Sequence, residues 1–233
     1  MKQMVVAIHQ PEFLPWLGFF DKMKKADKYI VFDNVQFKKR YFENRNKIKQ
    51  NDGPVWITVP VKSKGRYVQK INEVKIDNGS LWQKKIWNKI KHCYSKSPHL
   101  NEFENEIKDI IFSGKHEFLL DLNLAFIMWF RRVLGVNTPV EFSSDLGVEE
   151  YKASDLILEI CRVSGATQYL CGPSGKNYLN LDDFHQAGIE VVWQEFKHPR
   201  YFQQGRDFIP SLSALDIVLN CGTMSSDILF GSA

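Results

Sequence analysis

Apolar and polar positions alternate along residues 1–37 in a way that predicts a strand, a helix and a second strand. Residues 4–8 form an apolar run of strand length, and two prolines exclude a helix directly after it. The segment 16–25 then carries large apolar side chains at helical spacing, and residues 29–32 form the second apolar run. A strand, helix, strand unit of about 30 residues is the usual parallel crossover.

The middle of the chain is predicted to be mainly helical. Residues 55–61 alternate as a strand does, and residues 69–76 have the pattern of another short strand. From about 81 to 134 the apolar positions recur at helical spacing, and the segment 117–134 is apolar over most of its circumference. We therefore expect an α-helical insertion or subdomain at about 81–134.

The second half returns to short apolar runs separated by helical segments. Residues 138–142, 168–171 and 189–196 are predicted strands. Strands and helices that alternate at both ends of a chain are typical of an α/β fold. We expect a mostly parallel, doubly wound (Rossmann-like) sheet with an α-helical middle segment. A chain of 233 residues that is 44% hydrophobic fits one domain, 1–233.

The first candidate site residues follow the two N-terminal strands. His9 and Gln10 come after the first strand, and Asp33 and Gln36 come after the second. Ligands of open α/β sheets bind beyond the carboxyl ends of the strands, so these side chains are expected near one crevice. His9 is a candidate acid or base, with Asp33 orienting it or acting as the base. Alternatively, His9 caps a buried turn and Asp33 binds backbone N–H groups.

A basic segment follows the second strand, with six Lys and Arg residues between positions 38 and 49. Arg45 lies between two asparagines, and its planar guanidinium can bind a diphosphate while Asn44 adds hydrogen bonds. The alternative is a solvated basic loop or hairpin strand. We expect ligand contact for Asn44 and Arg45.

The glycine-rich loop 172–176 follows another predicted strand. Gly172 and Gly175 can expose backbone N–H groups to an anion, while Ser174 and Lys176 add a hydroxyl and a positive charge. The loop lacks the full phosphate-loop pattern, so it does not predict an ATPase site. As a tight turn without a ligand, it would need only its glycines.

The C-terminal part offers a second candidate acid or base. His198 follows the predicted strand 189–196, although local backbone could equally satisfy it before Pro199. Asp216 and Asn220 lie four residues apart on the last helix and so share a face. We expect that this pair either holds the His198 loop or touches substrate.

Composition narrows the classes of partner and cofactor. The net charge of +4, with a pI near 8.7, favours anionic, phosphate-bearing small ligands over nucleic acid. Four scattered cysteines argue against a zinc site and a disulfide framework, so no metal site is predicted. The dinucleotide glycine fingerprint is absent after the first strand, and no cofactor is firmly implied.

The sequence also bears on location. The longest apolar run, near 119–130, is interrupted by Asp121 and Asn123, so we expect no membrane span. Met1 leads straight into a strand and a polar loop, so we expect no signal peptide. The four scattered cysteines make a reducing cytoplasm the expected compartment. The pattern leaves the oligomeric state open.

Long stretches of the sequence resemble one protein family. The stretches are HQPEFLPWLGFFDKM, ADKYIVFDNVQF, ENRNKIK, WITVPV, YLCGPSGKNYL, FKHPRY and IPSLSALDIVLNCG. They look like the corresponding parts of the WbqC-like proteins and span nearly the whole chain. The resemblance implies a role among the enzymes that build O-antigen and other bacterial surface polysaccharides. It assigns no catalytic residue.

These observations favour an enzyme that modifies a nucleotide-linked sugar, most plausibly by transferring an acyl or aminoacyl group to the amine of a nucleotide-linked amino sugar. The acyl donor is not identified. One alternative is a nucleotidyltransferase-like enzyme that uses ATP and magnesium, although the segment 15–19 lacks the second histidine of such enzymes. Another is a non-catalytic sugar-nucleotide-binding protein of the pathway. An RNA-binding role ranks fourth.

Overall fold

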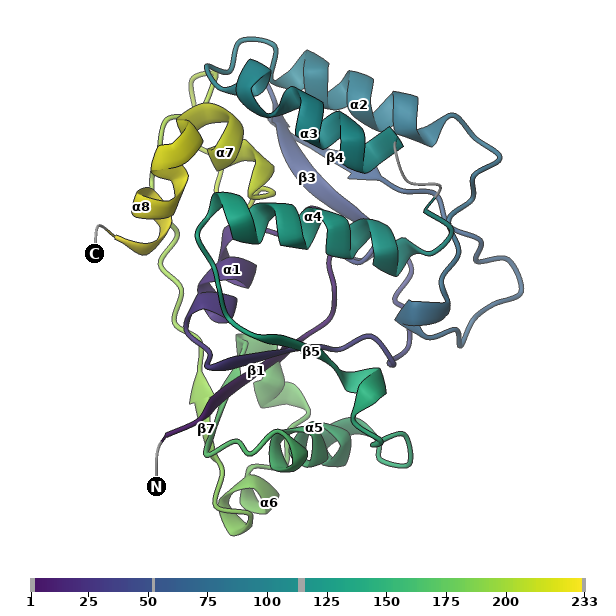
Figure 1. Ribbon diagram of the computed structural model, residues 1–233, viewed down its shortest axis with the longest axis vertical. Coiled ribbons are helices and arrows are strands. Elements are labelled where there is room, and N and C mark those ends of the chain that lie inside the picture. The colour runs from purple at the N-terminus through teal and green to yellow at the C-terminus, as the bar shows by residue number, and fades with distance from the viewer. Residues whose placement is uncertain (1–2, 52, 113–115, 232–233) are drawn as a thin grey trace. The chain divides into compact units, whose positions relative to one another are not determined.

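A computed structural model describes residues 3–51, 53–112 and 116–231, and these divide into two compact units (Figure 1). Unit 1 comprises Met1–Gln10, Asp21–Val35 and Asn137–Lys197. Unit 2 comprises Pro11–Phe20, Gln36–Val136 and His198–Ala233. The expected helical insertion at 81–134 lies wholly within unit 2.

Unit 1 is built on one parallel five-stranded sheet. Its strands run in the spatial order β5-β2-β1-β6-β7, and every neighbouring pair is parallel. Their bounds are β1 (Val5–His9), β2 (Lys28–Val31), β5 (Val140–Phe142), β6 (Gln168–Cys171) and β7 (Glu190–Trp193). The predicted α/β, Rossmann-like sheet is therefore confirmed.

The connections of this sheet place a topological switch point at its centre. The chain passes from β1 through α1 (Leu17–Lys24) to β2 on one side of β1, and later returns to β6 on the other side. Helix α5 (Ala153–Val163) precedes β6, and α6 (Leu181–Gln186) joins β6 to β7. The direction of winding reverses between β1 and β6, and open α/β sheets bind ligands at the carboxyl ends of such a pair.

The core of unit 1 lies between the sheet and helices α5 and α6, which Figure 1 shows beside the strands. Val6, Ile8 and Ile30 from the strands are buried with Leu156 and Ile160 of α5. The ring of Tyr169 stacks on that of Phe184 of α6, with 5.8 Å between centroids. These contacts hold the backbone of β1 and β6 on which the switch point depends.

Unit 2 combines an antiparallel hairpin with helices. The hairpin pairs β3 (Arg45–Gln50) with β4 (Gly53–Thr58). The helices are α2 (Trp82–Cys93), α3 (Leu100–Phe112), α4 (Leu119–Val133), α7 (Leu215–Cys221) and α8 (Ser225–Phe230), with Leu17–Phe20 of α1. The helices expected between 81 and 134 are thus present as α2, α3 and α4.

Helix α4 is the centre of the core of unit 2. The Phe126 ring meets that of Phe13 edge-on at 5.7 Å, and the Phe130 ring lies 5.3 Å from that of Phe20. Both α4 phenylalanines are fully buried. A helix surrounded on most sides must be apolar over most of its circumference, which explains the pattern seen in the sequence.

The predicted strand at 69–76 is wrong. The segment contains the 3₁₀ helix η1 (Ile71–Glu73), flanked only by isolated β-bridges. The carboxylate of Glu73 accepts a hydrogen bond from the backbone N–H of Lys70 at 2.9 Å, which favours a helical turn over extended backbone. In the described ranges, no helix is long and apolar enough to cross a membrane.

Candidate functional site

The switch point of unit 1 brings three sequence-predicted elements to one edge of the sheet. His9 is the last residue of β1, Gln10 follows it, and the loop 172–176 begins directly after β6. The backbone pairs β1 with β6 through residues 5–7 and 168–170, so these ends are neighbours. His9 is half-buried, and its Nδ1 atom is buried.

Lys22 adds a buried positive charge at this edge. Its side chain comes from α1, is only 3% exposed, and donates a hydrogen bond to the carbonyl of Ile8 at 2.8 Å. Burial raises the pKa of the Cys171 thiol at the end of β6, and the Lys22 ammonium opposes that rise. The ammonium therefore binds the end of β1 through a hydrogen bond and interacts electrostatically with the end of β6.

The loop after β6 is folded as the 3₁₀ helix η3 (Pro173–Asn177). The N–H of Gly175 donates to the carbonyl of Gly172 at 3.0 Å, and Gly175 is buried against Cys171 and Trp193. The Lys176 ammonium lies over the Trp193 ring, 5.4 Å from its centroid. Ser174 and Lys176 are exposed, and anion binding by this loop stays a prediction.

The two glycines of this loop should respond differently to substitution. We predict that Gly175→Ala lowers the free energy of unfolding by about 1–3 kcal/mol, because the new methyl group overlaps the Cys171 sulfur. The matched variant Gly172→Ala should change it by less than about 0.5 kcal/mol, since no atom lies within 4 Å of the added carbon and φ is −72°. Urea unfolding measures both, and equal costs would contradict the packing role of Gly175.

Asp33 ties the ends of β2 and β5 together within unit 1. Its carboxylate accepts hydrogen bonds from the Ser144 hydroxyl at 2.8 Å, the Ser144 N–H at 3.1 Å and the Ser143 hydroxyl at 3.0 Å. The side chain is 2% exposed. This geometry matches the alternative in which Asp33 binds local groups after the strand, while its role toward His9 or substrate stays a prediction.

Unit 2 contains a buried carboxyl cluster that the sequence analysis missed. Asn123 of α4 donates from Nδ2 to the carbonyls of Pro11, at 3.0 Å, and Glu43, at 2.8 Å. The carboxyl groups of Glu12 and Glu43 thereby come close enough to interact electrostatically. Glu43 is 1% exposed and Asn123 is 0% exposed. In the described part of the chain, neither Glu43 carboxylate oxygen makes a well-formed hydrogen bond.

Burial gives the Glu43 carboxyl unusual acid–base behaviour. Its pKa is raised from the ordinary value of 4.5 to about 7, mainly by burial and in smaller part by the charge of Glu12. The backbone N–H groups of Glu43 and Lys38, together with the Lys38 charge, act in the opposite direction. The group therefore exchanges a proton near neutral pH, as acid–base catalysis requires.

The predicted ligand residues of unit 2 near β3 make contacts within the protein. Asn44 is buried, and its side-chain Nδ2 donates to the backbone carbonyl of Val59 at 2.9 Å. The backbone carbonyl of Asn44 accepts a hydrogen bond from the Val59 N–H at 2.8 Å. The Arg45 guanidinium lies over the Trp56 ring, 4.1 Å from its centroid. Gln36 donates to the carbonyl of Tyr67 at 2.9 Å. Arg45 is half-buried and keeps part of its surface exposed to solvent.

Asp216 holds the segment that follows His198. Its carboxylate accepts hydrogen bonds from the hydroxyls of Tyr94 and Tyr201, both at 2.9 Å. Asn220 supports it by donating to its backbone carbonyl at 2.8 Å. Burial raises the Asp216 pKa to about 6. Asp216 thus contacts the segment after His198 through Tyr201, and a contact of this pair with substrate stays a prediction.

His198 is arranged as a neutral imidazole. Its Nδ1 lies 2.8 Å from the carbonyl oxygen of Pro199. A carbonyl oxygen only accepts hydrogen bonds, so Nδ1 carries the proton and Nε2 is the basic nitrogen. Burial lowers the His198 pKa, which favours the neutral ring. The ring also lies against Tyr201 and Phe208, with centroids 6.2 Å and 5.7 Å away.

The predicted site residues divide between the two units. Unit 1 contains His9, Gln10, Asp33, Gly172, Ser174, Gly175 and Lys176, whereas unit 2 contains Gln36, Asn44, Arg45, His198, Asp216 and Asn220. Among the residues whose positions are described, no three His, Cys, Asp or Glu side chains gather as a metal site would need.

Comparison with known proteins decides the family. Residues 10–228 match the sequence model of the WbqC-like protein family. The chain belongs to this family. This WbqC-like protein is also 35% identical over 225 residues to the uncharacterized protein Rv1507c of Mycobacterium tuberculosis, and the match covers 96% of each chain. A comparison with solved structures finds no match.

The family match includes the buried carboxyl cluster and begins at Gln10, so it does not include His9. A signal for the missed residues was nevertheless present in the sequence. Asn123 lies within an otherwise apolar helix, and Lys22 lies beside Met23 on the buried side of α1. Polar residues on buried helix faces require partners, and here those partners are carbonyls of the loop after β1 and of β1 itself.

The WbqC-like protein should lose stability between pH 4.5 and 7 because of Glu43. Its pKa is higher in the folded than in the unfolded chain, so the folded protein binds more protons in this window and stability falls as pH rises. A shift from 4.5 to about 7 corresponds to about 3 kcal/mol. Urea unfolding of the wild type and of Glu43→Gln is measured at several pH values. As the pH rises from 4.5 to 7, the free energy of unfolding of the variant should increase relative to that of the wild type.

The difference in unfolding free energy between the wild type and Glu43→Gln reports on Glu43 alone. Asp216 also titrates in this range, with its pKa raised by burial to about 6, but it is present in both proteins. A difference in unfolding free energy that stays constant from pH 5 to 8 would contradict the raised pKa of Glu43.

Proposed function

We propose that this WbqC-like protein is an enzyme of bacterial surface polysaccharide biosynthesis that transfers an acyl or aminoacyl group to the amine of a nucleotide-linked amino sugar. The observation that carries the proposal is the switch point between β1 and β6. Nucleotide-binding α/β sheets bind their ligands at such a point, beyond the carboxyl ends of the strands. Family membership supports the pathway.

The side chains at the switch point suit an anionic nucleotide-linked ligand. The Lys22 ammonium is fixed beneath the ends of the strands by its bond to the Ile8 carbonyl. Ser174 and Lys176 present an exposed hydroxyl and ammonium after β6. Phosphate oxygens accept hydrogen bonds from such groups and are neutralised by their charge. The glycine fingerprint of dinucleotide cofactors is missing after β1, where the sequence is His9-Gln10-Pro11.

The proposed transfer needs one base. The amine nitrogen of the sugar attacks the carbonyl carbon of the activated acyl group, forming a C–N bond. The bond between that carbon and the donor then breaks, and its electron pair leaves with the donor. We assign the removal of the amine proton to His9, which then returns it to the leaving group.

A thermal-shift panel tests the proposal. The probes are nucleotide-linked amino sugars, the same nucleotide-linked sugars with a hydroxyl in place of the amine, ATP with magnesium, and acyl-coenzyme A. A ligand at about 100 times its dissociation constant adds about 2.7 kcal/mol, which raises the melting temperature by several degrees. The proposal predicts stabilisation by the amino sugars.

Each outcome of the panel favours one reading. Stabilisation by ATP with magnesium alone favours nucleotidyl transfer. Stabilisation by nucleotide sugars without product under any acyl donor favours a non-catalytic binding protein. A second prediction tests the loop after β6. Lys176→Ala should weaken the stabilisation by the amino sugar, whereas Lys152→Ala, which removes an exposed lysine directly before α5, should not.

A further inference from the structure

Charge is distributed very unevenly between the two units. Unit 2 contains 22 of the 31 Lys and Arg residues but only 14 of the 27 Asp and Glu residues, a net charge of +8. Unit 1 contains 9 and 13, a net charge of −4. The modest +4 of the whole chain, which argued against a nucleic-acid partner, is therefore an average over opposite charges.

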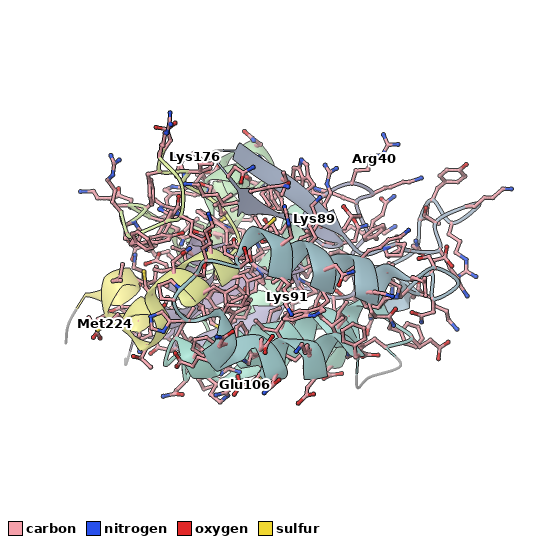
Figure 2. The ribbon with its side chains drawn as sticks, turned by 90° about the horizontal axis from the view of Figure 1, so that it is seen from above. Arg40, Lys89, Lys91, Glu106, Lys176 and Met224 are labelled. Atoms are coloured by element: carbon pink, nitrogen blue, oxygen red, sulfur yellow. The ribbon has the colours of Figure 1, made fainter. Side chains whose placement is uncertain are left out.

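The excess is concentrated further within unit 2. Residues 38–96 contain 16 Lys and Arg against 4 Asp and Glu. One of those acids, Glu43, is buried and has a pKa raised by burial, so it contributes little negative charge to the surface. In Figure 2, Arg40 projects from the ribbon at the edge of this region, and Lys89 and Lys91 mark helix α2.

Aromatic rings lie among these basic side chains on the hairpin. Lys47 of β3 pairs with Trp56 of β4, and the Arg45 guanidinium and Lys47 ammonium lie 4.1 Å and 5.0 Å from the Trp56 ring centroid. Trp56 is 38% exposed. Lys89 of α2 donates to the Trp56 carbonyl at 2.9 Å, so α2 contributes charge next to the same strand.

The surface continues into the loops before the hairpin. The Phe42 ring lies 5.8 Å from that of Trp56 and 5.2 Å from that of Tyr41, and Lys38 lies over Tyr41. The hydrogen bond from Gln36 to the Tyr67 carbonyl joins the loop 62–70 to this segment. We name this surface the basic aromatic face: Lys38, Tyr41, Phe42, Arg45, Lys47, Trp56, Tyr67 and Lys89.

We propose that the basic aromatic face binds RNA, and that an aminoacyl ester at the 3′ end of an RNA is the acyl donor. Closely spaced Lys and Arg residues neutralise successive phosphates, while exposed rings stack on unpaired bases. A nucleotide-linked sugar carries only two phosphates and one base, so it would occupy a small part of this face. The donor assignment rests on the proposed transfer.

An aminoacyl ester satisfies the chemistry of that transfer without another reactant. The amine of the sugar attacks the ester carbonyl carbon, and an amide C–N bond forms. The C–O bond to the terminal ribose breaks, and the ribose oxygen takes the electron pair. The proton lost by the amine ends on that oxygen, so the products are the amide and a deacylated RNA. The step involves no oxidation or reduction.

Fluorescence anisotropy with labelled, deacylated bulk transfer RNA tests the binding. The double variant Lys47→Glu/Lys89→Glu should weaken binding at least 10-fold and reduce the salt dependence of the affinity by about one to two phosphate contacts. The control Lys24→Glu/Lys152→Glu makes the same change in net charge with two exposed lysines of unit 1, and should weaken binding less than 3-fold.

Trp56→Leu tests the stacking contribution separately. Leucine keeps an apolar side chain on the strand but has no ring, so binding should weaken several-fold while its salt dependence stays unchanged. Circular dichroism and the melting temperature of each variant check that the hairpin is still folded. Equal losses for the two charge-reversal pairs, or binding to vesicles of phosphatidylglycerol without binding to RNA, would overturn the proposal.

The donor assignment fails separately from the proposed function. With a nucleotide-linked amino sugar as acceptor, product from aminoacyl transfer RNA and none from acyl-coenzyme A supports the RNA donor. Product from acyl-coenzyme A alone overturns the RNA donor and leaves the acyl transfer standing. Absence of product from both classes of donor overturns both.

Discussion

Replacing His9 with alanine should reduce kcat/KM for the proposed transfer about 10²- to 10⁴-fold, the usual contribution of a positioned general base. His9 closes β1 at the switch point, and its backbone, not its side chain, accepts the hydrogen bond from Phe32 that holds this edge. The melting temperature of the variant is measured beside kcat/KM, so that a loss of rate is separated from a loss of folding.

Two matched variants accompany this measurement. His185→Ala removes an exposed histidine from α6 of the same unit and should leave kcat/KM within 2-fold of the wild type. His198→Ala removes the other candidate base. If His198→Ala rather than His9→Ala causes the large loss of kcat/KM, the base is in unit 2 and the assignment to His9 is wrong.

Asn123→Ala should be the most destabilising of the proposed single substitutions, with a loss of about 2–4 kcal/mol in the free energy of unfolding. The asparagine is fully buried and donates two hydrogen bonds to backbone carbonyls. Alanine leaves the Pro11 and Glu43 carbonyls buried without this donor, and each unsatisfied group costs about 1–3 kcal/mol. Because Asn123 joins two separate loops to α4, Glu43 should also lose its fixed position.

Chemical denaturation measures this loss, with Asn105→Ala as the control. Asn105 is exposed on α3, so its replacement should change the free energy of unfolding by less than about 0.5 kcal/mol. A loss below about 1 kcal/mol for Asn123→Ala would show that water satisfies the carbonyls as well as the asparagine does.

The parallel sheet could be predicted because its strands are short, apolar and separated by helical periodicity. Residues 168–171 are predicted as a strand and form β6 with the same bounds, and the helical spacing predicted from about residue 81 begins as α2, Trp82–Cys93. The order β5-β2-β1-β6-β7 could not be predicted, because every buried strand of a parallel sheet has a similar apolar pattern. The switch point followed only from that order.

The candidate site was only partly predictable for a related reason. His9 and the loop 172–176 could be found because each follows a predicted strand. Glu12, Glu43 and Asn123 are far apart in sequence and have no common spacing, so nothing in a linear pattern joins them. Their association depends on the backbone contacts that fold residues 11–14 against residues 42–46, such as the bond from the Phe13 N–H to the Phe42 carbonyl.

The charge of the surface shows the same dependence on folding. The Lys, Arg and aromatic residues between 38 and 96 are visible in the sequence, but the sequence does not show which of them share one surface. The hairpin register places Lys47 opposite Trp56, and the bond from Lys89 to Trp56 places α2 beside them. The basic residues of β3, the aromatic residue of β4 and the lysines of α2 form one extended surface only through these contacts.

Mass spectrometry of the reaction product tests the central claim most directly. The wild-type protein is incubated with a nucleotide-linked amino sugar and, in turn, with aminoacyl transfer RNA and acyl-coenzyme A, and His9→Ala is run beside it. The account predicts a nucleotide sugar heavier by the mass of one acyl or aminoacyl group, formed on the amine and strongly reduced with His9→Ala. An unmodified amino sugar across a broad set of donors and acceptors, under conditions where the sugar stabilises the folded protein, would contradict the proposed transfer.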